Sequence, residues 1–184
     1  MENETLPLRQ KILIGLTIFV GLIILILFQY QLVDNPTLKL LIFLYSFLIP
    51  FFLLGFETLI DLNSNRIYFI WLVISVIFFG IYFLAKDDAT FLIRQNFSAN
   101  TNDGVKFYLS NSALSPFKSL FFFLIAFKVA NGLMKKITGN YLLNTYRQMS
   151  WVHDSKNRKI TGLDVLFNIL LSIVIIISAM IRLF

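Results

Sequence analysis

One lysine lies inside an apolar segment that is long enough to cross a membrane. Lys128 lies within residues 117–136, FKSLFFFLIAFKVANGLMKK, a segment otherwise dominated by phenylalanine, leucine and other apolar residues. A charged side chain in hydrocarbon is costly, and it usually pairs with another polar group or reaches water. A partner for Lys128 is therefore expected among the polar residues that reach the same depth.

Four polar residues are expected at a depth similar to that of Lys128. Glu57 lies near the end of the second apolar segment, and Asn131 lies about one helical turn after Lys128. Asp164 and Asn168 lie in the first turns of the last apolar segment. These five residues are a candidate intramembrane polar cluster of the kind found in ion and proton pathways. The alternative is structural: Glu57 belongs to a solvated helix end, Asp164 caps a helix, and Lys128 extends its ammonium to the membrane surface.

The residue types needed for enzymatic or metal chemistry are scarce. The chain has no cysteine and a single histidine, His153, which leaves almost no ligands for a zinc or haem site. The absence of cysteine also excludes disulfides, thiol catalysis and iron–sulfur clusters. No glycine-rich phosphate loop is present. We expect no catalytic residue, no bound metal, no cofactor and no enzymatic activity.

The apolar residues occur in long blocks. Of 184 residues, 58% are hydrophobic and 14% are charged, against roughly 45–50% apolar and about 25% charged in ordinary globular domains. The blocks do not alternate between apolar and polar residues, which disfavours a membrane β-barrel. The sequence predicts an all-α, polytopic membrane protein, in which residues 1–184 form one bundle of about five transmembrane helices. The predicted spans are 12–30, 37–60, 67–85, 117–136 and 163–181.

Local signals mark the ends of several predicted helices. Residues 34–36, Asp-Asn-Pro, are typical of a helix start, and Pro50 predicts a kink within the helix that follows. Gly139 is a candidate site for the end or a bend of the fourth helix. Thr161 and Asp164 have the spacing of a capping box at the start of the fifth helix.

Two polar segments join the later helices. Residues 86–116 are predicted to be an extracytoplasmic loop on the membrane surface, with a short helix through 91–93. Residues 137–160 are predicted to be a cytoplasmic basic loop, with an amphipathic interfacial helix over 139–152. The candidate interfacial anchors of this helix are Tyr141, Tyr146, Arg147 and Trp151.

Lysine and arginine are unequally divided between the two sides of such a bundle. The N-terminus, the turn at 61–66 and the loop at 135–160 together carry nine bases, and the opposite side carries six. The positive-inside rule then predicts a cytoplasmic N-terminus and an extracytoplasmic C-terminus in the cell (inner) membrane. Membrane topology and anionic headgroups also explain the net charge of +6, and we expect no nucleic-acid partner.

Three classes of function stay open. The first is a non-enzymatic membrane subunit, accessory protein or scaffold, which acts by helix packing in a homo-oligomer or a larger membrane complex. The second is a small ion or solute channel or transporter that uses the Lys128, Glu57 and Asp164 cluster. The third is a membrane regulator or effector of a host-defence system. In each class the lipid bilayer is a partner.

Overall fold

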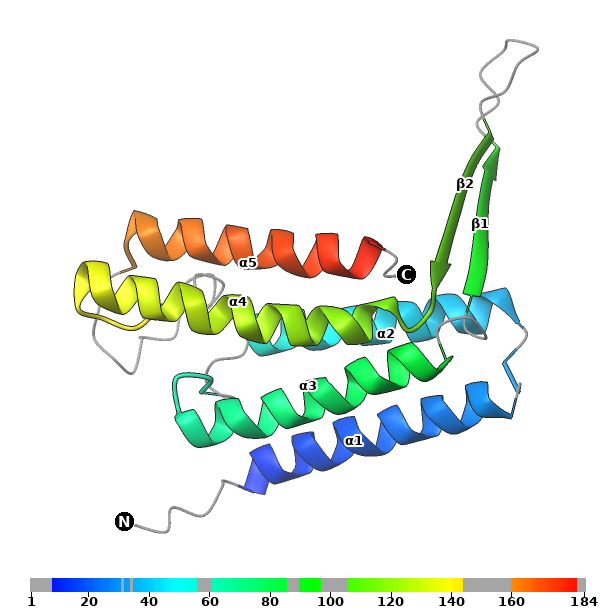
Figure 1. Cartoon of the computed structure of the whole chain (residues 1–184), viewed down its shortest axis with the longest axis horizontal. Helices are drawn as coiled ribbons and strands as arrows, with labels where there is room; N and C mark the ends of the chain where they lie inside the picture. Colours follow the sequence, from blue (N-terminus) through cyan, green and yellow to red (C-terminus); the bar gives the residue numbers. More distant parts are fainter. Residues whose placement is uncertain are drawn as a thin grey trace.

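Five long helices and one β-hairpin make up the described part of this computed structural model (Figure 1). The structure describes residues 8–30, 32–33, 35–55, 61–85, 90–96, 106–143 and 160–181. The elements follow in the order α1 (Leu8–Gln29), α2 (Pro36–Gly55), α3 (Asn65–Ala85), β1 (Thr90–Asn96), β2 (Lys106–Ser112), α4 (Ser115–Thr138) and α5 (Gly162–Met180).

Each helix coincides with one predicted span. All five are long and apolar enough to cross a membrane. The differences lie at the ends, where α1 begins at Leu8 and α4 extends from Ser115 to Thr138. The last five residues of the predicted second span, 56–60, lie outside the described residues. The long apolar blocks therefore predicted the existence and order of the helices correctly.

The helices run up and down, and α4 occupies the centre. It packs against α2, α3 and α5, whereas α1 packs against α3 (Figure 1). The starts of α1, α3 and α5 lie at one end of the bundle, which we call the Asp164 end. The starts of α2 and α4 and the base of the hairpin lie at the other end, which we call the Lys118 end.

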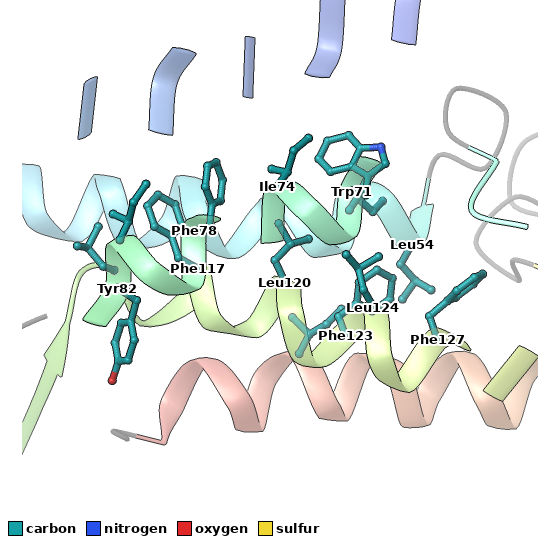
Figure 2. Close-up of a cluster of buried hydrophobic side chains, with 14 of the residues drawn as sticks. Leu54, Trp71, Ile74, Phe78, Tyr82, Phe117, Leu120, Phe123, Leu124 and Phe127 are labelled. Atoms are coloured by element: carbon teal, nitrogen blue, oxygen red, sulfur yellow. The ribbon is translucent and has the colours of Figure 1, made fainter. Parts of the chain in front are cut away.

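Aromatic and aliphatic side chains from α2, α3 and α4 form a buried cluster in the bundle (Figure 2). The rings of Phe78 and Phe117 stack with their centroids 4.5 Å apart. Burial of such side chains contributes about 1.5–3 kcal/mol each when they leave water, whereas in lipid their contribution comes from close packing. The residues labelled in Figure 2 are Leu54, Trp71, Ile74, Phe78, Tyr82, Phe117, Leu120, Phe123, Leu124 and Phe127.

The segment between α3 and α4 contains a hairpin, and the predicted short helix through 91–93 is wrong. Strands β1 and β2 pair antiparallel, from Thr90 opposite Ser112 to Asn96 opposite Lys106. A short apolar triplet does not distinguish a helix from a strand, and β-branched and aromatic residues favour the strand. The hairpin extends across the direction of the helices, and β1 contacts α2 (Figure 1).

The capping signals of α2 and α5 are confirmed. At the start of α2, the Asn35 Oδ1 accepts a hydrogen bond of 2.9 Å from the backbone N–H of Thr37. At the start of α5, Thr161 and Asp164 form the expected capping box. Each of these bonds satisfies a backbone N–H that a helix start would otherwise leave without a partner.

Gly139 ends α4 rather than bending it. It adopts the left-handed conformation (φ 75°), and its N–H bonds the carbonyl of Lys135 at 2.9 Å. Residues 140–143 continue without helical structure, so the predicted interfacial helix does not begin at 139. Residues 144–152 of that prediction lie outside the described residues. Glycine suits this position because a left-handed backbone is strained for other residues.

Candidate functional site

Asp164 joins the start of α5 to the segment that follows α4. Its carboxylate is fully buried. Oδ2 accepts hydrogen bonds from the N–H and the hydroxyl of Thr161, at 2.8 and 2.7 Å, and Oδ1 accepts one of 3.0 Å from the N–H of Leu143. These donors, together with its place in the first turn of a helix, stabilise the negative charge.

Asn168 lies one turn further along α5 and binds the same segment. Its Nδ2 donates to the carbonyl of Leu143 at 2.8 Å and to the carbonyl of Asp164 at 2.7 Å. Asp164 and Asn168 therefore bind both backbone polar groups of Leu143. The Oδ1 of Asn168 is buried and finds no hydrogen-bond donor in the described part of the chain.

Asn131 on α4 completes this network. Its Oδ1 accepts a hydrogen bond of 2.8 Å from the N–H of Leu142, and its Nδ2 donates to Asn63 Oδ1 at 2.7 Å. The amide thus connects the turn before α3 to the segment after α4. We call Asn131, Asp164 and Asn168 the loop clamp, because they hold the backbone of residues 142–143 between α4 and α5.

Lys128 lies outside the loop clamp. Its side chain is exposed, and its Nζ donates to Asn65 Oδ1 at 3.0 Å and lies 4.8 Å from the centre of the Tyr68 ring. Both contacts are on α3, whereas the carboxylate of Asp164 is buried and binds Thr161 and Leu143. The expected partnership of Lys128 with Asp164 is therefore replaced by contacts with uncharged groups of α3.

The five residues of the predicted cluster thus have different places. The structure brings Asn131, Asp164 and Asn168 together around the backbone of residues 142–143. It places Lys128 on the α3 side of α4. Glu57 lies outside the described residues. The cluster is in part a structural network that fixes a chain segment, as the capping alternative for Asp164 implied.

Tyr141 is the one predicted interfacial anchor among the described residues. Its side chain is exposed, and Lys135 Nζ lies 3.3 Å from its hydroxyl oxygen and 5.0 Å from its ring centre. Tyr146, Arg147 and Trp151 lie outside the described residues. An exposed lysine beside a tyrosine at a helix end suits the headgroup region, so the anchor role of Tyr141 stays a prediction.

Lys118 is a second buried charge, and it was not predicted from the sequence. It lies in the first turn of α4 and is fully buried. Its Nζ donates to Ser115 Oγ at 3.1 Å and to the carbonyl of Ile181, and it lies 4.7 Å from the centre of the Tyr82 ring. Lys118 is one of the six bases counted on the extracytoplasmic side. Its place directly after Phe117, at the start of the predicted fourth span, was the available signal.

Ser115 and Lys118 have the three-residue spacing of a serine–lysine pair, in which a lysine activates a nucleophilic hydroxyl. Both side chains are, however, fully buried. The ammonium also donates to a carbonyl just beyond α5, where a positive charge compensates the negative end of the helix dipole. The contacts of Lys118 therefore indicate a structural role, in which it joins the start of α4 to the end of α5, rather than a role as a catalytic base.

Three buried hydroxyl groups, on α1, α2 and α3, bind their own helices. They donate to carbonyls about one turn earlier, at distances of 2.7–2.8 Å: Thr17 to Leu13, Ser46 to Ile42, and Ser75 to Leu72. Between the two ends, the side chains of Figure 2, from α2, α3 and α4, form a buried hydrophobic cluster. In the described part of the chain, an apolar layer thus separates the loop clamp from Lys118.

The described residues contain no group of three or more histidine, cysteine, aspartate or glutamate side chains placed to hold a metal ion.

No protein-family model, curated protein or solved structure matches this chain.

Proposed function

We propose that this chain is a multi-pass integral membrane protein and a non-enzymatic subunit or accessory protein of a homo- or hetero-oligomeric membrane complex. Its five apolar helices support membrane insertion, and each exposes large apolar side chains on its outer surface. In water such faces would favour aggregation, whereas in lipid they need no other partner. Examples, one from each helix in order, are Phe19, Leu48, Phe69, Val129 and Ile169.

The observation that carries the proposed role is that the buried polar groups of the loop clamp and of Lys118 bind other groups of the same chain. The loop clamp binds backbone groups of residues 142–143, and Lys118 binds Ser115 and the carbonyl of Ile181. A channel or transporter needs polar groups along a pathway, and an enzyme needs reactive groups that open to a pocket. The apolar layer between the two ends favours a packing role over conduction. The role in host defence has no specific structural support.

The distribution of charge supports an orientation with the N-terminus in the cytoplasm and the C-terminus outside. The start of α1 and the end of α5 lie at opposite ends of the bundle (Figure 1). The Asp164 end carries exposed basic residues, which the positive-inside rule assigns to the cytoplasmic side. These residues are Lys11, Arg66, Lys128, Lys135 and Lys136.

The hairpin would then lie on the extracytoplasmic side, where it offers a surface beyond the helices. An isolated two-stranded hairpin is marginally stable in water, and its outer edges can pair with a further strand. We therefore include β1 and β2, with the outer faces of the helices, in the surface that contacts a partner or a second copy.

Purification in a mild detergent tests this proposal. An N-terminally tagged chain, expressed at its native level, is purified, and the mass and stoichiometry of the complex are measured by native mass spectrometry. We expect a homo-oligomer or a partner at fixed stoichiometry. A variant in which a short Gly-Ser linker replaces residues 90–112 is the control for the hairpin, and we expect it to weaken the assembly. A monomer that conducts ions in liposomes would contradict the proposal and favour the channel.

A further inference from the structure

The ammonium of Lys128 has an unusual environment for a charge on an apolar helix. It is exposed, and both contacts that the structure gives it, with the Asn65 amide oxygen and the Tyr68 ring, are with uncharged groups. An amide dipole and an aromatic ring stabilise a cation, but they do not neutralise it. The charge is therefore available to an anion that approaches from outside the bundle.

The contacts of Lys128 also define its depth. Asn65 is the first residue of α3, so the ammonium reaches the level at which α3 begins. Its Cα lies further inside, because α4 continues from position 128 to Thr138. The side chain thus extends from an apolar part of α4 towards the cytoplasmic end of the proposed bundle. Long basic side chains near helix ends commonly extend in this way towards the lipid headgroups.

We propose that Lys128, held by Asn65 and Tyr68, binds the phosphate of an anionic phospholipid headgroup in the cytoplasmic leaflet. The inference rests on the proposed membrane location. A lipid phosphate is the anion available at this depth on the outer surface of α3 and α4, and anionic lipids are concentrated on the cytoplasmic side. The two contacts on α3 orient the ammonium before the lipid arrives, which lowers the entropy lost on binding.

The site can be tested with phosphatidylglycerol. The purified full chain in a neutral detergent is titrated with phosphatidylglycerol, with phosphatidylcholine and with soluble glycerol phosphate, and bound lipid is counted by native mass spectrometry. We expect the wild-type protein to retain phosphatidylglycerol more strongly than the other two. Lys128→Met should weaken this binding by about fivefold, the effect of one basic residue near an anionic surface. Lys128→Arg should restore most of it.

Lys136→Met is the matched control, because Lys136 is an exposed lysine about two turns further along the same helix. It should change phosphatidylglycerol binding by less than Lys128→Met does. Asn65→Ala keeps the charge and removes the orienting amide, so it should weaken binding by about two- to threefold. This variant also serves as the test if Lys128→Met does not fold.

Several results would overturn the inference. Unchanged phosphatidylglycerol binding in both Lys128→Met and Asn65→Ala would exclude the site, and equal binding of glycerol phosphate would assign it to free phosphate. Equal losses in Lys128→Met and Lys136→Met would indicate a diffuse basic surface. Failure of the proposed membrane location is distinguishable, because the protein would then leave the membrane fraction on alkaline washing before any titration.

Discussion

Gly21 of α1 lies against the ring of Phe78 on α3, so closely that a Cβ at position 21 would be 2.5 Å from Phe78 Cε1. The ring has little freedom to move, because it is buried and stacks on Phe117. This close approach fixes α1, which packs against α3, to the rest of the bundle.

Gly21→Ala should separate α1 from α3. The added methyl group forces the buried Phe78 ring or the helix to shift, and such overpacking costs about 1–3 kcal/mol of unfolding free energy. Gly15→Ala on the same helix is the control, since its Cβ would meet nothing within 4 Å apart from the adjacent residues and the backbone of its own helix. The control should be neutral or stabilising by up to about 1 kcal/mol through helix propensity. Thermal unfolding of both variants in one detergent measures the difference, and equal effects would contradict the packing.

Removal of the Asp164 carboxylate should destabilise the bundle strongly. Asp164→Ala removes the Asp164 half of the capping box and leaves the N–H of Thr161 and the buried N–H of Leu143 without this acceptor, at a cost of about 2–4 kcal/mol in unfolding free energy. Asn35→Ala removes a more exposed cap at α2 and should cost only about 1 kcal/mol. Denaturant titration followed by circular dichroism compares them. A smaller loss in Asp164→Ala than in Asn35→Ala would count against the loop clamp.

Lys118→Met should lower stability, although it removes a charge from an apolar helix. The substitution breaks the hydrogen bonds from a buried ammonium to Ser115 and Ile181, worth about 1.5–3 kcal/mol for a charged donor. Lys136→Met, at an exposed position of the same helix, should change stability by less than about 0.5 kcal/mol. Melting temperatures in the same detergent test the pair. A stabilising effect of Lys118→Met would show that the charge itself is the larger cost.

Lys128 and Asp164 should act independently. The sequence alone suggested an ion pair, but their contacts lie on different sides of α4. The unfolding free energies of Lys128→Met, Asp164→Asn and the double variant should therefore add within about 0.5 kcal/mol. A larger coupling energy would show that Lys128 and Asp164 interact, as the sequence suggested.

The orientation can be tested with single cysteines, because the chain has none of its own. Thr37 and Asn140 are both exposed, near the Lys118 end and the Asp164 end respectively. A cysteine at Thr37 should react with an impermeant maleimide in intact cells, and one at Asn140 only after permeabilisation. The reverse pattern would invert the proposed topology, and labelling of both in intact cells would change the number of spans.

The parts of the fold that the sequence predicted well are those determined by local composition. Long apolar blocks are sufficient for helices, and cap residues such as Asn35 and Thr161 mark where helices begin. The hairpin was missed because its pairing joins residues 91–93 to residues 109–111, well separated along the chain. A three-residue apolar segment carries too little periodicity to reveal such a pairing.

The candidate site was only partly predictable for a different reason. Sequence spacing along a helix gives depth, and three residues of similar expected depth, Asn131, Asp164 and Asn168, bind the same two-residue segment. It does not give the direction in which a helix face points, and this direction places the Lys128 side chain against α3. Lys118 depends on a contact across 63 positions, from α4 to the end of α5, which no local pattern contains.

The contact between Lys118 and Ile181 also has a consequence for biogenesis. The acceptor carbonyl lies beyond α5, so it is synthesised only after the whole of α4. Helix α4 is the least apolar of the five and is therefore the one that enters a bilayer least readily alone. In the proposed membrane setting, we therefore expect α4 and α5 to insert as a pair, because α5 brings the carbonyl that binds the Lys118 ammonium of α4.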